Sequence, residues 1–411
     1  MCSTSISVPR ACEIQSQPDG PAIADMHEST PNQHPRVLIL TLHHGSTHVR
    51  LSRALEKALL QLRPNLKVEV VDALAHCEAW FRAYYNSYEI PLKYWPGLWD
   101  YIESHQFEGE TTGPWWLYRL GARPLFQFIK AWAPDVVAAT EVGLGEFAII
   151  HKRDTGAQYS LVGIETFAFE RPWAKPEVDL YVSYPGEVAN QVRSLGVPEE
   201  KILECGVPVD PVFALSSDRP ALRGRLGLRD DLPVLLVNFG GSGKRKPREV
   251  VSELQKVQLP FQVVFVSRRD ERLRKELLRL TAGMAHVRIL SWVDNMHEWM
   301  AAADILISRA GGGILAESLN CGLPILVFDA PPGNERRFCR LIEECWHTGY
   351  WVEGPGQLAA RIDQLLRKSE DLEMLRSNAR QHAYPDAARI AAEAILHLRD
   401  RSATSAEREI F

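Results

Sequence analysis

Three consecutive glycines followed by a glutamate form the stretch best suited to bind an anion. The glycines at 311–313 stand between an apolar segment, 304–307, and a helical pattern, 314–319, so they are predicted to lie at a strand-to-helix turn. Such a turn lets an anion approach the backbone and directs the amides and the positive end of the helix dipole towards it. We predict a phosphate site at Gly311, Gly312 and Gly313, with Glu317 accepting hydrogen bonds from sugar hydroxyls.

Two further polar segments follow predicted strands. The strand at 324–328 runs into a loop that holds Asn334 and Glu335, and the strand at 233–238 runs into the glycine-rich segment 239–245. The second is not a P-loop, because Asn238 and Arg245 stand where that motif needs glycine and a hydroxyl residue. Its backbone and cations still suit a diphosphate. We therefore predict that Gly241, Ser242 and Lys244 bind the diphosphate.

Parallel strands are needed to hold these turns together. Apolar runs of strand length alternate with helical patterns along the chain, beginning with a strand at 37–42, a helix up to Leu62 and a strand at 67–72. This alternation predicts an α/β fold with two doubly wound, Rossmann-like domains. The predicted divisions are an unstructured segment at 1–35, a first domain at 36–211, a second domain at 212–385, and a C-terminal helix and tail at 386–411.

Composition narrows the class of protein. The chain has 411 residues, 45% of them hydrophobic, which suffices for two domains. It shows no apolar run of membrane-spanning length and no signal-like apolar core at its start, so we expect a cytoplasmic protein. The formal charge of −5 argues against wholesale nucleic-acid binding. The seven cysteines include no Cys-x-x-Cys pair, so the sequence indicates neither a zinc site nor a disulfide framework.

The segment from Trp80 to Trp132 is rich in aromatic and basic residues. Tryptophan and tyrosine mixed with lysine and arginine are typical of a surface that meets a membrane, because the rings lie at headgroup depth while the cations meet anionic lipid. We therefore predict an anionic membrane surface as a partner of the first domain. The residues assigned to acceptor or membrane contact are Trp95, Trp115 and Trp116.

The region 292–336 resembles the donor site of a family of UDP-sugar glycosyltransferases. The family includes monogalactosyldiacylglycerol synthase, the bacterial processive diacylglycerol glucosyltransferases and, more distantly, the peptidoglycan-pathway N-acetylglucosaminyltransferase. The shared pattern is a glycine-rich turn, a glutamate on the next helix and the Pro-Gly-Asn-Glu loop at 332–335. The resemblance implies the GT-B architecture, in which two Rossmann-like domains face a cleft. It also implies that the backbone at Val293 binds uracil, Glu317 the ribose, and Asn334 and Glu335 the hexose.

The resemblance further implies catalytic residues in the first domain. His48 ends the segment 45–48, which is similar to the family's glycine-rich turn ending in Gly-His. Inversion at the anomeric carbon also needs a base for the acceptor hydroxyl. The relatives have a Thr-Asp pair and a histidine four residues on, but here Thr166 and Glu170 occupy the aspartate and histidine positions. Glu165, one residue away, is the substitute carboxylate, so the catalytic assignments are His48, Glu165 and Glu170.

These features predict an inverting transferase that moves a hexose from a UDP-sugar to the hydroxyl of a lipid at the inner face of the cell membrane. Diacylglycerol is the favoured lipid acceptor. No cofactor and no metal ion is expected, because the helix dipole and lysines neutralise the leaving group. Three alternatives stay open: a UDP-N-acetylglucosamine-dependent transferase acting on a polyprenyl-linked or other glycan acceptor, a UDP-sugar 2-epimerase, and a non-catalytic UDP-sugar binder. The sequence also leaves open the hexose, processivity and the number of subunits.

Overall fold

The computed structural model describes residues 35–43, 47–87, 89–95, 97–98, 101–102, 105, 109–215, 218–240, 246–331, 333–354 and 356–408. His34–Phe411 forms one compact unit. Gly241, Ser242 and Lys244, all predicted to bind the donor, lie outside the described residues, as does almost all of the predicted unstructured segment 1–35.

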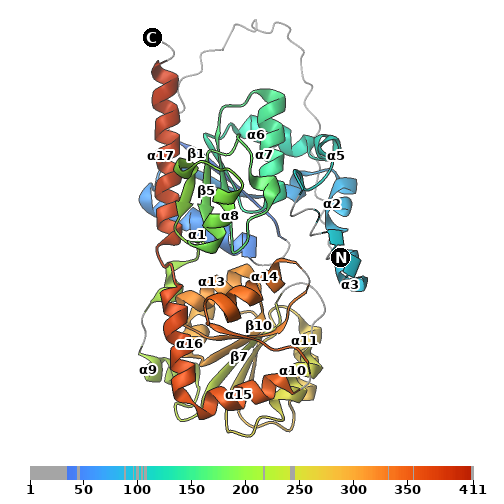
Figure 1. Ribbon diagram of the computed structural model, residues 1–411, viewed down its shortest axis with the longest axis vertical. Helices are drawn as coiled ribbons and strands as arrows, with labels where there is room; N and C mark the ends of the chain where they lie inside the picture. Colours follow the sequence, from blue (N-terminus) through green and yellow to red (C-terminus); the bar gives the residue numbers. More distant parts are fainter. Residues whose placement is uncertain are drawn as a thin grey trace, which may run out of the picture. The chain divides into compact units, whose positions relative to one another are not determined.

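The described strands form two parallel sheets of six strands each (Figure 1). The first sheet has the order β2-β1-β3-β4-β5-β6 and the second has the order β12-β11-β10-β7-β8-β9. The strands of the first sheet, which we call the N-terminal sheet, are β1 (Arg36–Thr41), β2 (Lys67–Asp72), β3 (Val136–Ala139), β4 (Ser160–Ile164), β5 (Leu180–Ser183) and β6 (Ile202–Glu204). Those of the C-terminal sheet are β7 (Val234–Asn238), β8 (Gln262–Val266), β9 (Val287–Leu290), β10 (Ile305–Arg309), β11 (Ile325–Asp329) and β12 (Gly349–Trp351).

Helices cover both faces of the sheets, as parallel strands require. Strands β3, β4 and β8 are buried along their whole length, which explains why they read as continuous apolar runs. The helices are α1 (Thr47–Leu62), α2 (Ala79–Asn86), α3 (Glu89–Tyr94), α5 (Trp115–Gly121), α6 (Arg123–Trp132), α7 (Val142–Thr155), α8 (Glu187–Ser194), α9 (Arg219–Leu226), α10 (Pro247–Leu254), α11 (Glu271–Leu280), α12 (Met296–Ala302), α13 (Gly312–Asn320), α14 (Asn334–Arg340), α15 (Gln357–Arg367), α16 (Ser369–Gln381) and α17 (Ala387–Arg408). The predicted fold class, α/β with two doubly wound sheets, is confirmed.

The order in which the strands are added reverses once in each sheet, and the point of reversal determines where a ligand can bind. In the N-terminal sheet β1 lies between β2 and β3, and in the C-terminal sheet β7 lies between β8 and β10. Register pairs Leu40 with Ala139 in the first sheet and Asn238 with Ser308 in the second. The loops that leave the carboxyl ends of these strands in opposite directions open a crevice between them, where α/β proteins bind ligands.

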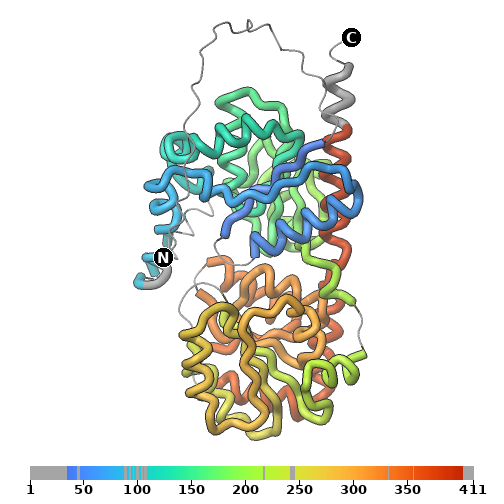
Figure 2. Tube along the Cα trace, turned by 180° about the vertical axis from the view of Figure 1, so that it is seen from behind, coloured from blue at the N-terminus to red at the C-terminus, as the bar shows by residue number. Residues whose placement is uncertain are grey.

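The last helix returns to the N-terminal sheet. Helix α17 packs against α1, β3 and β4, although the chain has just completed the C-terminal sheet, and both views show it alongside the first helix (Figures 1 and 2). Its buried face is made of small and aliphatic side chains at helical spacing, among them Ala388, Ala392 and Ile395. Arg63 Nη2 at the end of α1 pairs with Asp400 Oδ2 at 2.5 Å. The end of the chain therefore stabilises the helix that begins beside His48.

Two short edge strands were not predicted from the sequence. Strand β6 lies close to the predicted end of the first domain at residue 211, and β12 follows a π-helical turn, Leu341–Cys345. Each has only three residues, so neither is long enough to show an apolar pattern.

Candidate active site

Two adjoining cavities lie at the carboxyl ends of the strands. The larger, about 570 Å³, we call the donor cavity, and the smaller, about 300 Å³, we call the catalytic cavity. Both are lined by residues that follow strands of both sheets. Thr47, Gly311 and Glu335 line both, so the glycine-rich turn forms the boundary between them.

The donor cavity is lined by five of the seven described residues that were predicted to bind the donor. Its lining includes Val293, Gly311, Gly313, Glu317 and Glu335. Gly312 instead faces the catalytic cavity. The five lining residues come from the β9–α12 loop, the start of α13 and the start of α14, so three separate strand-to-helix connections converge on one space.

The three glycines provide room rather than an unusual backbone. None of them has a positive φ, and Gly311 precedes α13 with φ −73°. A Cβ on Gly313 would lie 3.1 Å from both Cα and Oγ1 of Thr47, which belongs to the first turn of α1. The Gly313 amide donates a hydrogen bond to Thr47 Oγ1 at 3.1 Å. The missing side chain at 313 therefore allows α1 to reach the start of α13.

Glu317 is buried and holds a charged partner from α1. Its carboxylate accepts a hydrogen bond from Arg50 Nη1. Burial raises the pKa of Glu317 to about 6, while the charge and hydrogen bond of Arg50 act against that rise. At neutral pH Glu317 is therefore mostly ionised, which is the form that accepts hydrogen bonds from a diol.

The loop after β11 is shaped by glycine and held by ion pairs. Gly333 has φ 100°, a conformation that L side chains rarely adopt, and it starts α14 at Asn334. Asn334 Nδ2 donates to Glu170 Oε1 at 3.1 Å, and Arg309 Nη2 donates to Glu335 Oε1 at 2.9 Å. The two residues predicted to bind the hexose are thus oriented by partners on opposite sides of the boundary.

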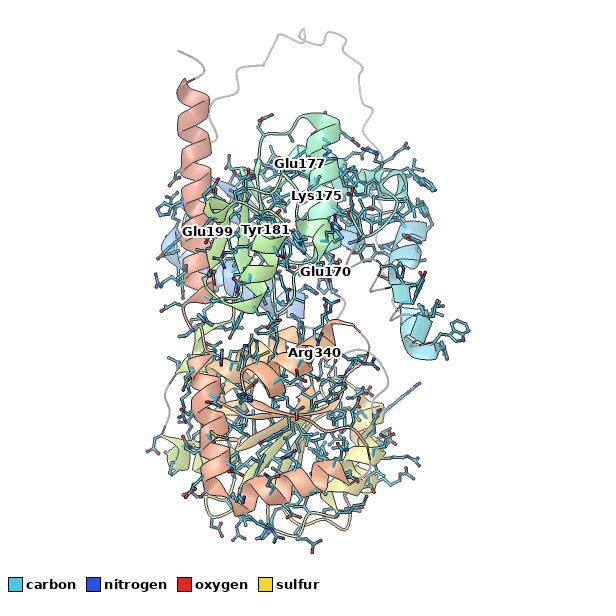
Figure 3. The ribbon with its side chains drawn as sticks, in the orientation of Figure 1. Glu170, Lys175, Glu177, Tyr181, Glu199 and Arg340 are labelled. Atoms are coloured by element: carbon cyan, nitrogen blue, oxygen red, sulfur yellow. The ribbon has the colours of Figure 1, made fainter. Side chains whose placement is uncertain are left out.

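The catalytic cavity brings the three predicted catalytic residues together. His48, Glu165 and Glu170 all line it, next to Asn334 and Glu335. Figure 3 labels Glu170 on the side of the N-terminal sheet that faces α14, where Arg340 is also labelled. Residues from 165 to 170 follow β4, so the segment that departs from the family pattern still reaches the same space as His48.

His48 has a defined tautomer. Its Nδ1 donates to the backbone oxygen of Thr140 at 2.7 Å, since a carbonyl oxygen can only accept. The neutral ring then keeps its lone pair on Nε2. This hydrogen bond connects the first turn of α1 with the residue that follows β3.

Glu165 is the most deeply buried acid of the cavity. It is 3% exposed, and among the described residues its Oε1 has no hydrogen-bond partner. Burial raises the pKa of Glu165 well above its ordinary value, and the charges of Glu170 and Glu141 add to the rise. A raised pKa makes the ionised carboxylate a stronger base, which suits Glu165 to accept a proton from a hydroxyl.

The three predicted membrane residues have different environments. Trp95 and Trp116 are exposed, at 60% and 63%. Trp115 is half-buried, its indole donates to Glu146 Oε1 at 3.0 Å, and the guanidinium of Arg153 lies over its ring. Other large exposed hydrophobic side chains of the same segment are Trp80, Tyr84, Ile90, Tyr94, Leu98, Tyr101 and Leu120.

Sequence reasoning missed four residues that shape the site. Thr47 and Arg50 are three residues apart, which places them on one face of α1, and Arg309 holds Glu335. Glu141 lines the catalytic cavity and accepts from Tyr85 OH at 2.9 Å. The helical spacing of Thr47 and Arg50 was a usable signal, whereas nothing in the local sequence connects 141 with 165.

Among the described residues, no cluster of three or more His, Cys, Asp or Glu side chains is arranged to hold a metal ion. No helix in the described part of the chain is long and apolar enough to span a membrane.

Comparison with known proteins identifies the second half of the chain. Residues 235–390 match the glycosyltransferase family 28 C-terminal domain. A processive diacylglycerol beta-glucosyltransferase of Bacillus cereus (strain G9842) is 24% identical over 376 residues, which cover 89% of this chain and 94% of that protein. MurG of Acinetobacter baumannii has a similar structure, with a TM-score of 0.59, 14% identity, and coverage of 88% of this chain and 99% of that one.

A UDP-GlcNAc 2-epimerase from Neisseria meningitidis, bound to UDP-GlcNAc, is equally similar in fold. Its TM-score is 0.58 at 14% identity, over 88% of this chain and 100% of the epimerase. Transferases and an epimerase thus share the architecture, and the choice between these activities depends on residues rather than on fold. Residues 235–390 match the glycosyltransferase family 28 C-terminal domain, and the protein is a glycosyltransferase of GT-B architecture whose resemblance to the processive diacylglycerol glucosyltransferases is confirmed.

Proposed function

We propose that the protein is an inverting glycosyltransferase that moves a hexose from a UDP-sugar to the hydroxyl of diacylglycerol, without a metal ion. The observation that carries the proposal is the pair of cavities that meet at the glycine-rich turn. One cavity is lined by the predicted nucleotide residues and the other by His48, Glu165 and Glu170.

The donor extends across this boundary. Its uridine occupies the donor cavity, where the backbone at Val293 meets uracil and Glu317 meets the ribose. Its diphosphate lies at the start of α13, whose amides and dipole stabilise negative charge. Its hexose passes the boundary to Asn334 and Glu335, which leaves the anomeric carbon facing the catalytic cavity.

The reaction forms one bond and breaks one at the anomeric carbon. The acceptor oxygen attacks from the side of Glu165, its proton passes to the Glu165 carboxylate, and the bond to the diphosphate oxygen breaks so that UDP leaves on the opposite face. His48, held by Thr140, orients the acceptor hydroxyl through Nε2. The charge of Glu170 keeps the pKa of Glu165 high and so keeps the base strong.

The lipid acceptor and the membrane are supported by two observations. Several aromatic side chains between Trp80 and Leu120 are exposed, with Trp95 and Trp116 among the most exposed. Rings of this kind insert at headgroup depth. The relatives named as diacylglycerol glucosyltransferases span nearly the full chain. We therefore place the enzyme at the cytoplasmic face of the cell membrane, on anionic lipid.

A panel of donors and acceptors tests this function. The protein is incubated with UDP-glucose, UDP-galactose, UDP-glucuronate or UDP-N-acetylglucosamine, each with and without diacylglycerol in anionic liposomes, while UDP release and glycolipid mass are measured. Glycolipid with the β linkage from an α-linked donor supports the proposal and names the hexose. Conversion of the free UDP-sugar without acceptor would favour an epimerase instead, and UDP binding with no product in any mixture would overturn the diacylglycerol acceptor.

A further inference from the structure

Arg50 brings a positive charge to the place where the donor diphosphate is expected. It lies in the first turn of α1, its side chain is 36% exposed, and it lines the donor cavity. Two other cations of this cavity have acidic partners elsewhere, because Lys57 pairs with Asp210 and Arg309 pairs with Glu335, a predicted hexose residue. Arg50 instead pairs with Glu317, the predicted ribose ligand.

The position of the second guanidinium nitrogen shows where this charge points. Nη1 of Arg50 bonds Glu317, while Nη2 lies 3.2 Å from the point that a Cβ on Gly313 would occupy. Gly313 is in the first turn of α13, at the helix end where the diphosphate is proposed to bind. The guanidinium therefore spans from the ribose ligand to the anion-binding end of the helix.

This arrangement depends on glycine at position 313. A Cβ there would be in tight contact with Thr47 and with Arg50 at 3.1 to 3.2 Å, and the contact with Thr47 involves backbone, which cannot swing away as a flexible side chain can. Gly313 thus makes room for two residues of α1, and one of them carries the charge. The third glycine, which looked like part of a phosphate turn, has this second role.

The chemistry of the leaving group calls for such a cation. When the anomeric bond breaks, negative charge builds up on the diphosphate oxygens, and preorganised donors aimed at that charge lower the barrier. A guanidinium presents several N–H donors in a fixed fork, so one group can bond a carboxylate and a phosphate together. Resting on the proposed function, we propose that Arg50 binds the donor diphosphate while it keeps its contact with Glu317.

Binding of uridine, UMP and UDP, measured by calorimetry on the full chain, tests the proposal. The measured quantity is the ratio of the uridine Kd to the UDP Kd, which isolates the phosphate contribution. In Arg50→Gln this ratio is expected to fall by roughly 10- to 100-fold, the loss of one charge-assisted hydrogen bond. Arg50→Lys keeps the charge without the fork and should recover part of the ratio. Melting curves check that each variant is folded.

Two controls separate diphosphate binding from an effect through Glu317. Arg53→Gln, one turn further along α1, removes an equal charge that pairs with Glu56 on the same helix, and the ratio should stay near that of the wild type. In a Glu317→Gln background, Arg50→Gln should still lower the ratio by a similar factor. A Gly313→Ala variant should lower it as well, because the new methyl group displaces Arg50.

Each outcome is decisive. An unchanged ratio in Arg50→Gln, or a fall that disappears in the Glu317→Gln background, would show that Arg50 only orients Glu317 and would overturn the proposal. If the wild-type protein binds UDP no more tightly than uridine, the proposed donor site fails and the Arg50 proposal fails with it. The wild-type ratio therefore distinguishes the two failures.

Discussion

Removing the Glu317 carboxylate should abolish recognition of the ribose. Glu317 is 2% exposed and lines the donor cavity. A hydrogen bond to a charged group contributes about 1.5 to 3 kcal/mol, which predicts that UDP binds Glu317→Ala roughly 10- to 150-fold more weakly. The fold should survive, because Arg50, the partner left behind, is 36% exposed and can be hydrated.

A change in the ligand tests whether the contact is to the ribose. 2′-Deoxy-UDP lacks one of the two hydroxyls, so the wild-type protein should bind it more weakly than UDP. Glu317→Ala should bind both ligands with nearly equal affinity, because the group that distinguishes them is gone. Calorimetric titration of both proteins with both ligands completes the cycle. Undiminished discrimination in Glu317→Ala would refute the assignment of Glu317 to the ribose.

The dependence on pH provides a second check. The pKa of Glu317 is raised to about 6, and the ionised carboxylate is the better acceptor. Affinity should therefore fall as pH decreases through about 6, and it should not change over this range in Glu317→Ala. Uridine is the ligand for this measurement, because a terminal phosphate titrates near pH 6 as well. A wild-type uridine affinity that is constant from pH 7.5 to about 5 would contradict the reasoning.

Three further predictions concern the base, the fold and the membrane surface. Glu165→Gln should leave UDP affinity nearly intact and reduce kcat by roughly 100-fold or more. At pH 8 the same variant should also unfold at a higher temperature than the wild type. In the wild type the pKa of the buried acid is raised, so its ionisation costs stability as pH increases. Asp304→Asn should destabilise the protein by about 3 to 5 kcal/mol in urea unfolding, since Asp304 is buried and pairs with three arginines. Trp116→Ala should weaken binding to anionic liposomes in a sedimentation assay without changing UDP affinity, whereas Trp115→Ala should lower the melting temperature.

Matched variants make these predictions refutable. Glu170→Gln removes a neighbouring charge that raises the pKa of Glu165, so the rising limb of the plot of kcat against pH should move to lower pH. A rising limb that does not move would argue against Glu165 as the base. Asp386→Asn breaks an exposed pair with Arg389 and should cost less than about 1 kcal/mol, so an equal loss in Asp304→Asn would contradict the role of burial. Unchanged liposome binding in Trp116→Ala would remove that ring from the membrane surface.

The local sequence was sufficient for the architecture and for the donor side of the site. Apolar runs predicted β1, β7, β10 and β11 within a residue or two, because strands buried on both faces leave an uninterrupted signal. The glycine turn, Glu317 and the Asn334-Glu335 loop could be assigned because each follows such a strand directly. The positions of these residues follow from their order along the chain, which the sequence gives directly.

Contacts between the two sheets were decided by tertiary structure alone. The Arg50–Glu317 pair joins residues 267 positions apart, and the Asn334–Glu170 bond joins residues 164 apart. In the sequence, Arg50 is a charged residue off the apolar face of a helix, which normally indicates solvent. Only the position of α1 over the start of α13, made possible by the absent side chain of Gly313, turns it towards the donor cavity.

The environment of the base also required the folded chain. The sequence supplied a glutamate next to the expected position, but its burial and its proximity to Glu141 and Glu170 are produced by the two loops that follow β3 and β4 and line one small cavity. A pKa depends on the medium and charges around a group, and those come from residues distant in sequence. The sequence thus determined which chemical groups are present and which strand each one follows, while the packing of the two sheets determined their partners, their charge states and the space they share.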